Sequence, residues 1–283
     1  MSDPFAPFRV TGRTALVTGA RREIGRAIAL GLAGAGARLA IHHAGTTEEA
    51  SDAAAVVRGI QAIGGEAAAF GQDFARDDAG HHLAAAVTRW APIDILVLNA
   101  SIELPEDFRA ITRERFDQQI AVNLRTTMEL LQTLLPPMAE RGWGRVVTIG
   151  SVQQERPHPA MFVYAGTKAA QLNWTLSLAR EFGGQGVTVN NLAPGAILTA
   201  RNHDQMAVRA RHWHSASPPG ALAGRTIWWA LQCCCAPRPA ATSTGSICSW
   251  MVGGWRCDDW AAAPTASRSR LPKFQSGACT LPA

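Results

Sequence analysis

Short apolar runs alternate with longer segments of helical periodicity through the first 204 residues. The runs predict strands at residues 14–19, 37–42, 67–73, 94–100, 145–151 and 187–194. Between them, apolar residues recur every three or four positions and predict helices at residues 24–35, 47–63, 77–90, 112–140 and 160–183. This alternation is typical of an α/β fold with a doubly wound parallel sheet, whose ligand crevice lies at the carboxyl ends of the strands.

The pattern changes near residue 205. Beyond it Pro, Trp and Cys are mixed without a clear period, and residues 261–283 have the composition of a disordered tail. All six cysteines lie in this part of the chain, at Cys233, Cys234, Cys235, Cys248, Cys257 and Cys279. Three adjacent cysteines fit no zinc spacing, and the N-terminus lacks the apolar run of a secretory signal, so we expect neither zinc nor disulfides. The boundary separates a domain at residues 10–204 from an irregular segment at residues 205–283.

The net charge of +5 also belongs to the C-terminal segment. From Gln205 onward there are eight Lys and Arg against Asp258 and Asp259, so the preceding residues carry −1. A domain without excess positive charge is not expected to bind nucleic acid. No stretch approaches the uninterrupted apolar length of about 18 residues that a membrane span needs. We therefore expect a cytoplasmic protein with neither nucleic-acid nor membrane partners.

One pair of residues stands out by its rarity. Tyr164 is the only tyrosine of the chain, and Lys168 is its only lysine before the C-terminal segment. Residues four apart on a helix share a face, so the phenol and the ammonium would lie side by side. A tyrosine pKa of about 10 is too high for easy proton exchange at neutral pH, but a neighbouring ammonium favours the phenolate. An isolated pair of this spacing is more often an ordinary surface pair, so other motifs must decide.

A glycine turn follows the first expected strand. In "TGARREIGRAIA", Gly19 and Gly25 bracket the passage from strand to helix. Glycines allow the backbone to approach a pyrophosphate, and the helix start adds unpaired N–H groups and a positive dipole end. The position of the turn between the first strand and a helix predicts a dinucleotide site.

These features together resemble the short-chain dehydrogenase/reductase family over about residues 12–202. Its T-G-x-x-x-G-x-G motif is matched by Thr18, Gly19 and Gly25, with Glu23 in place of the middle glycine. The other matches, in family order, are Asp73, Asn99 to Ser101 as "NAS" for N-A-G, Asn123, Ser151, Tyr164 with Lys168 as Y-x-x-x-K, "APG" and Thr199. The resemblance implies a single Rossmann-type domain, with residues 10–204 as its dinucleotide-binding catalytic part.

The resemblance also implies a catalytic set of Asn123, Ser151, Tyr164 and Lys168. Tyr164 would give a proton to a carbonyl oxygen that Ser151 positions, and Lys168 would also hold the nicotinamide ribose. Asn123 would hold a water that connects Lys168 to solvent. Taken alone, Ser151 could simply end a strand, and Asn123 could bend its helix through backbone bonding. The implied partners are a small-molecule carbonyl or alcohol and further copies of the chain, in a dimer or tetramer built through the helices at 112–140 and 160–183.

The end of the second strand favours NADP(H) as the cofactor. It carries no carboxylate before Glu48 to hold a ribose hydroxyl, and Arg21 and Arg22 stand in the glycine turn, although both could also be solvated. Glu23 would repel phosphates unless it turns outward and pairs with an arginine. The expected cofactor-binding residues are Thr18, Gly19, Arg21, Arg22, Ile24, Gly25, His43, Asp73, Phe74, Asn99, Ala100, Tyr164, Lys168, Pro194, Gly195, Ile197 and Thr199. No metal site is expected, because His42, His43, His81 and His82 have no carboxylate at ligand spacing.

Two other classes of function remain open. A dinucleotide-binding regulatory module without turnover would explain Glu23 and the irregular C-terminal segment, but the full set of four catalytic residues argues against it. A serine hydrolase using Ser151 is disfavoured because the G-x-S-x-G motif is absent.

The C-terminal segment departs from the family pattern. The family closes its sheet with a helix, a seventh strand and an acidic-Gly-Gly motif, and residues 205–283 show no such pattern. When each codon is rebuilt from the last base of one residue and the first two of the next, the single codons of Trp250 and Met251 permit Val-Asp, followed by Gly-Gly. We therefore predict that the segment from about residue 211 is a frameshifted reading, and that the chain as written lacks a seventh strand and exposes a sheet edge.

Overall fold

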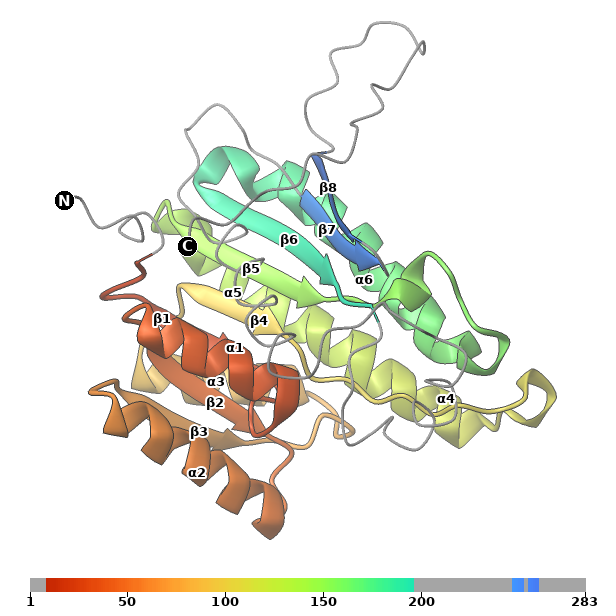
Figure 1. The fold of residues 1–283 in the computed structure, drawn as a ribbon, viewed down its shortest axis with the longest axis horizontal. Coiled ribbons are helices and arrows are strands. Elements are labelled where there is room, and N and C mark those ends of the chain that lie inside the picture. Colours follow the sequence, from red (N-terminus) through yellow and green to blue (C-terminus); the bar gives the residue numbers. More distant parts are fainter. Residues whose placement is uncertain (1–8, 196–245, 252–253, 260–283) are drawn as a thin grey trace, which may run out of the picture.

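The computed structural model describes residues 9–195, 246–251 and 254–259. Its sheet has the strand order β3-β2-β1-β4-β5-β6-β7-β8, and every neighbouring pair is parallel except β7 and β8 (Figure 1). The strands are β1 (Thr14–Val17), β2 (Arg38–His43), β3 (Ala67–Gly71), β4 (Ile95–Leu98), β5 (Gly144–Ile149), β6 (Val187–Ala193), β7 (Ser246–Met251) and β8 (Gly254–Asp259). The expected doubly wound α/β sheet is confirmed.

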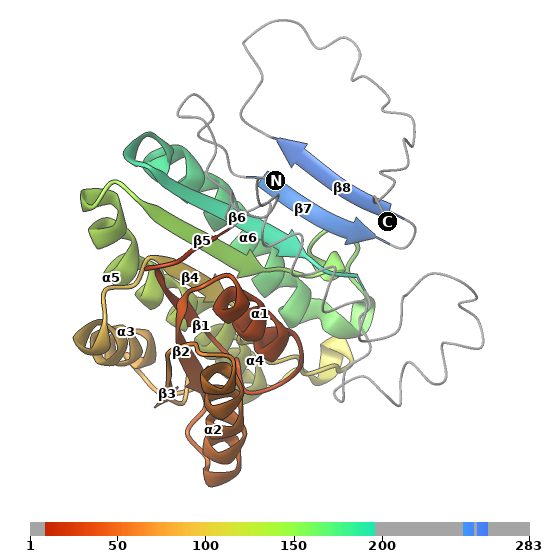
Figure 2. The same ribbon diagram turned by 60° about the vertical axis from the view of Figure 1, so that its left-hand side comes forward.

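Helices cover both faces of the sheet (Figure 2). They are α1 (Glu23–Gly34), α2 (Thr47–Ala62), α3 (Ala79–Trp90), α4 (Arg113–Ile120), α5 (Thr126–Glu140) and α6 (Phe162–Phe182). Because successive strand residues point to opposite faces, Val17 packs with α1 and α2 in one core, and Leu16 packs with α3 and α5 in the other. Strands buried on both faces explain why they read as continuous apolar runs in the sequence.

The single helix expected at residues 112–140 is interrupted. Between α4 and α5 lies a π-helical turn, η3 (Ala121–Arg125), in which the Thr126 hydroxyl donates to the carbonyl of Ala121 at 3.1 Å. A π turn contains one more residue than an α turn and often occurs at a functional site. Asn123 lies in the middle of this one, where apolar periodicity could not reveal the break.

The expectation that the chain lacks a seventh strand is wrong. Strand β7 lies parallel to β6, with Asn191 opposite Ile247, and β8 returns antiparallel to β7. Ladder bonds are made by backbone groups, so the open edge of β6 can be paired by a segment whose side-chain pattern is unlike that of the other strands. Strand pairing does not test the reading frame itself, and the rest of the predicted segment, at residues 211–245, 252–253 and 260–283, lies outside the described residues, as do Ile197 and Thr199.

Within the described ranges, no helix is both long and apolar enough to cross a membrane.

Candidate active site

A cavity of about 460 Å³ lies at the carboxyl ends of the central strands. It is lined by most of the residues that the sequence pointed to, namely Gly19, Arg21, Arg22, Ile24, Gly25, His43, Asp73, Phe74, Asn99, Ala100, Ser151, Tyr164, Lys168, Pro194 and Gly195. Thr18 and Asn123 do not line it but lie buried behind its wall. The edge of the sheet predicted to hold a ligand is therefore where these residues meet.

The glycine turn forms a tight cradle at one end of the cavity. Gly19 has a φ of +63°, and a Cβ there would lie 3.1 Å from the Cα of Ala100. A Cβ on Gly25 would overlap the carbonyl oxygen of Gly19. Arg22, the N-cap of α1, makes no side-chain cap bond within the described residues, so its side chain does not cover the start of the helix. These features fit a diphosphate group.

Thr18 and Asn99 join the glycine turn to the end of β4. The Thr18 hydroxyl accepts the N–H groups of Asn99 and Ala100, each at 2.9 Å. The Asn99 amide donates to the carbonyls of Thr18 and Gly19 at 2.9 and 3.2 Å. The Asn99 side chain therefore fastens the glycine turn to β4, and Thr18 supports the site from behind.

His42 links the glycine turn to the loop after β3. Its Nδ1 accepts the N–H of Gly19 at 3.1 Å, and its Nε2 lies 2.9 Å from the carbonyl oxygen of Gln72. Because a backbone N–H only donates and a carbonyl only accepts, the ring must be neutral with its proton on Nε2. Its face stacks on Phe74 with 4.1 Å between ring centroids. Burial is the main cause that lowers the pKa of His42 from 6.5 to about 4, in keeping with this neutral form.

Arg21 pairs with two carboxylates of α2. Its guanidinium lies 3.0 Å from Glu49 and 2.7 Å from Asp52. Glu49 lines the cavity and accepts the N–H of Ala44 at 2.8 Å, so its carboxylate stands at the end of β2. Burial lowers the pKa of the adjacent His43, and the charge of Glu49 opposes this shift. Strand β2 itself has no carboxylate at its end, but Glu49 of α2 places one there.

Glu23 adopts a left-handed backbone, with a φ of 49°. The family motif has glycine at this position, and a side chain at such a φ costs about 1–2 kcal/mol. Glu23 is exposed and lines the mouth of the cavity. Glu23 therefore belongs to the residues around the glycine turn at this end of the cavity.

Three catalytic candidates meet at the other end of the cavity. Helix α6 carries Tyr164 and Lys168 on one face, with Nζ 5.7 Å from the centre of the phenol ring. Both are buried, Lys168 to 1% exposure, and Nζ donates to the carbonyl of Ile149 at 2.8 Å. Ser151 follows β5 and caps a short 3-10 helix, with its hydroxyl accepting the N–H of Gln153 at 3.2 Å. The pairing of phenol and ammonium expected from i,i+4 spacing is present in the structure.

Asn123 faces the loop after β4. Its side chain accepts the N–H of Ile102 and donates to the carbonyl of the same residue, both at 2.9 Å, and it also donates to Thr167 at 3.1 Å. These bonds fix the wall formed by Ile102. The helix-bending alternative does not describe this side chain, since none of these partners belongs to its own helix.

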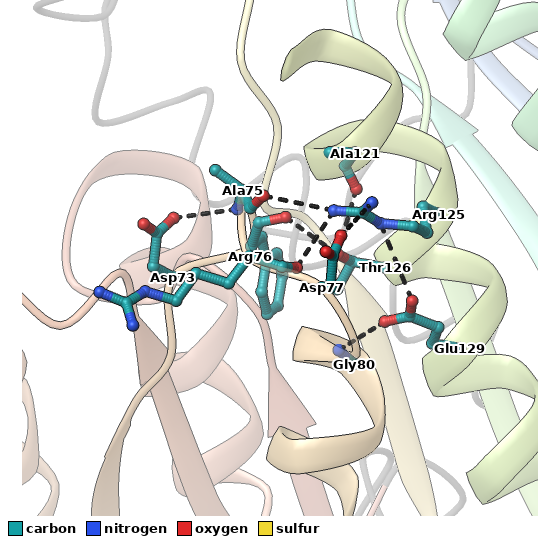
Figure 3. A network of polar contacts seen from close by, with 10 residues as sticks. Asp73, Ala75, Arg76, Asp77, Gly80, Ala121, Arg125, Thr126 and Glu129 are labelled. Carbon is teal, nitrogen blue, oxygen red and sulfur yellow. Dashed lines mark hydrogen bonds and ion pairs between the residues drawn. The ribbon is translucent and has the colours of Figure 1, made fainter. Parts of the chain in front are cut away.

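A second polar network fixes the loop that carries Asp73 (Figure 3). Arg125 bonds Asp77 at 2.6 Å and the carbonyls of Ala75 and Arg76 at 3.2 and 3.1 Å. Asp73 closes its own turn by accepting the N–H of Ala75 at 2.9 Å. The loop after β3 is thereby tied to the π turn, so both ends of the cavity rest on the same element.

The structure also brings possible metal ligands together. Asp78, His81 and Glu129 present ligand atoms within 4.8 Å of one another, a grouping that sequence spacing could not show. Glu129, however, accepts the N–H of Gly80 at 2.8 Å, and the Arg125 guanidinium lies 3.9 Å away (Figure 3). The carboxylate therefore already caps the start of α3 beside a cation, and we assign no metal to it.

Three residues of the site escaped the sequence analysis. His42 and Glu49 gave no signal beyond their nearness to the end of the second strand. Gln171 follows Lys168 by one turn of α6 and accepts from its Nζ at 3.1 Å. A polar residue on the otherwise buried face of that helix was the available sign.

Comparisons with known proteins agree with this geometry. The family model described as "short chain dehydrogenase" matches residues 13–209. A 3-oxoacyl-(acyl-carrier-protein) reductase of Staphylococcus epidermidis is 34% identical over 188 residues, 66% of this chain and 76% of the relative. A gluconate 5-dehydrogenase of Gluconobacter oxydans is 36% identical over 193 residues, 68% and 74% of the two chains. The crystal structure of a 3-oxoacyl (acyl-carrier-protein) reductase from Agrobacterium tumefaciens with NADP bound superposes with a TM-score of 0.75 at 39% identity, covering 83% of this chain and 91% of that one.

Replacing Glu23 by glycine should stabilise the fold. Removal of the left-handed strain is expected to raise the free energy of unfolding by about 1 kcal/mol, measured by urea denaturation. Asp78→Gly is the matched control, since Asp78 is the other described non-glycine residue at positive φ, 55°. Aspartate tolerates this region better than glutamate, so its gain should be smaller. A loss of stability in Glu23→Gly would contradict the argument from strain.

His42 should make the protein acid-sensitive. Its folded pKa of about 4 lies below the unfolded 6.5, so its contribution is complete above about pH 6.5 and is lost as the pH falls toward 4. The loss amounts to about 3 kcal/mol at most. His42→Asn, which keeps an acceptor for Gly19 but does not titrate, should flatten the pH dependence of urea unfolding between pH 6.5 and 4.5. An unchanged slope in that variant would assign the sensitivity to other groups.

Proposed function

The chain belongs to the short-chain dehydrogenase family, and we propose that it is an NADP(H)-dependent carbonyl reductase or alcohol dehydrogenase acting on a small-molecule substrate. The observation that carries this proposal is the meeting of Tyr164, Lys168 and Ser151 on a cavity whose other end is a glycine cradle. Residues 10–204 form the proposed catalytic domain. The non-catalytic alternative has no support among these observations, since a binding module would not need the buried ammonium beside the phenol.

The residues of the site would divide the work as follows. The Tyr164 hydroxyl gives its proton to the carbonyl oxygen of the substrate, and the Ser151 hydroxyl donates a hydrogen bond to the same oxygen. The Lys168 ammonium favours the phenolate that remains. When bound, the cofactor supplies the hydride in reduction and accepts it in oxidation. In oxidation the Tyr164 phenolate takes the proton from the alcohol.

The cofactor would extend from the glycine turn to the catalytic end. Gly19 and the start of α1 would hold the diphosphate, and Asp73 with Phe74 would flank the adenine. Support for NADP(H) comes from Arg22 at the cavity, together with the NADP bound to the Agrobacterium tumefaciens relative. Glu49 opposes this preference by placing negative charge at the end of β2, whereas Glu23 lies by the diphosphate cradle, which both cofactors would share.

The proposal extends to assembly and location. Phe116 on α4 and Met128 on α5 are 43% and 41% exposed, large apolar side chains on helices through which a homodimer or tetramer would form. A cytoplasmic location accords with a reaction that draws on the cellular pool of NADP(H).

Tyr164→Phe should abolish turnover while sparing the cofactor. Loss of the only proton donor is expected to lower kcat about 10²–10⁴-fold, with the NADPH dissociation constant nearly unchanged in a fluorescence titration. Lys168→Ala should lower kcat and also weaken NADPH binding, because that side chain would favour the phenolate and hold the nicotinamide ribose. Turnover of Tyr164→Phe at the wild-type rate would refute the proposed chemistry.

Two charge changes should move cofactor selection in opposite directions. Arg22→Ala removes a charge-assisted contact of roughly 1.5–3 kcal/mol and should narrow the preference for NADPH over NADH. Glu49→Gln removes a carboxylate from the same end of the cavity and should increase the preference for NADPH over NADH. Asp52→Asn is the control, because Asp52 also pairs with Arg21 but is not among the lining residues. Both dissociation constants are measured by fluorescence, and equal binding of NADH and NADPH by the wild type would contradict the cofactor assignment.

A further inference from the structure

A buried amide connects the catalytic lysine to the π turn. Gln171 is 1% exposed, and its Oε1 accepts from Lys168 Nζ at 3.1 Å. Its Nε2 donates to the carbonyl oxygen of Asn123 at 2.6 Å and to the Thr127 hydroxyl at 3.1 Å. One side chain thus spans the space between the ammonium and the backbone of η3.

The orientation of this amide follows from the polarity of its partners. An ammonium can only donate, so it must face the amide oxygen, and a carbonyl can only accept, so it must face the amide nitrogen. The two hydrogens of Nε2 are both used, one on Asn123 and one on Thr127. Rotating the amide by half a turn would set donor against donor and acceptor against acceptor.

The carbonyl of Asn123 is occupied by protein groups. Besides Gln171, the Thr127 hydroxyl donates to it at 2.8 Å, so side chains take both of its acceptor directions. The water that the family resemblance places between Asn123 and Lys168 is replaced here by the Gln171 side chain. An amide N–H does not pass protons as water or a hydroxyl does, so this link transmits charge and position but no proton.

We infer that Gln171 is a positioning residue, which holds the Lys168 ammonium toward Tyr164 and closes the route for protons through Asn123. The inference rests on the proposed function, since it concerns the proton donor of that reaction. The proton that restores the Tyr164 hydroxyl after each reduction comes from water in the cavity, and one proton is consumed with each hydride transferred. The carbonyls of Ile149 and Asn123 and the hydroxyl of Thr127, which bond Lys168 and Gln171 from β5, η3 and α5, are neutral, and Glu103 lines the cavity from the loop after β4.

Two substitutions separate positioning from simple packing. Gln171→Met keeps the length of the side chain but removes the acceptor for Lys168 and the donor for Asn123. Gln171→Glu keeps the shape and the acceptor for Lys168, but it replaces the donor to Asn123 and Thr127 by an oxygen and adds a negative charge that offsets the ammonium. Both changes make the Tyr164 phenolate less favourable, so the pH profile of alcohol oxidation should shift upward by about one unit or more, which is about a tenfold loss of rate below the apparent pKa.

Thr175→Val is the control for packing. Thr175 lies one turn further along the same helix, is equally buried, and bonds Thr148 at 3.0 Å. Its substitution should lower the melting temperature and leave the apparent pKa unchanged. NADPH titration of every variant checks that the cofactor site is intact, and Gln171→Glu serves if Gln171→Met does not fold.

The measurements distinguish a positioning role of Gln171 from a packing role, and both from failure of the proposed function. Upward shifts in the Gln171 variants with NADPH binding retained support the inference. Profiles like the wild type, with losses of melting temperature like that of Thr175→Val, would reduce Gln171 to a packing residue and leave the proposed function standing. Wild-type protein that binds neither NADPH nor NADH would overturn both the proposed function and the inference.

Discussion

A buried ammonium is the constraint on which the catalytic half of this structure depends. Lys168 is 1% exposed, and a charge so far from water must be surrounded by acceptors. The carbonyl of Ile149 and the amide of Gln171 meet this need, and they fix the end of β5 and the π turn relative to α6. The position of Ser151, two residues after Ile149, follows from the same arrangement.

The cofactor half depends on the fixed polarity of backbone groups. A neutral His42 fits between an N–H of the glycine turn and a carbonyl of the loop after β3, and Asn99 with Thr18 closes the turn onto β4. These contacts hold Gly19 and the start of α1 in place at the end of the cavity that fits a diphosphate. Binding would therefore require little rearrangement of this end.

The charged side chains near the end of β2 have opposing effects on the choice between NADP(H) and NAD(H). Arg21 would favour a phosphate, but Glu49 and Asp52 hold it against α2. Glu49 stands where an acidic residue of the strand itself would otherwise distinguish the two cofactors. In the proposed function, the selectivity of the site would depend on a balance of these nearby charges.

The sequence by itself determined the order of strands and helices, the glycine turn and the pairing of Tyr164 with Lys168, because these depend on periodicity and on spacing within one element. It could not determine β7, since ladder pairing uses backbone groups common to all residues. Nor could it determine the π turn at Asn123, because α4 buries only Gln119 and so has no apolar stripe whose register could be compared with that of α5. His42, Glu49 and Gln171 acquired their roles only from the tertiary structure. His42 bonds Gly19, Glu49 pairs with Arg21, and Gln171 bonds Asn123, so each contact joins residues 23 to 48 positions apart in the chain. Only packing decides which polar atoms meet across such separations.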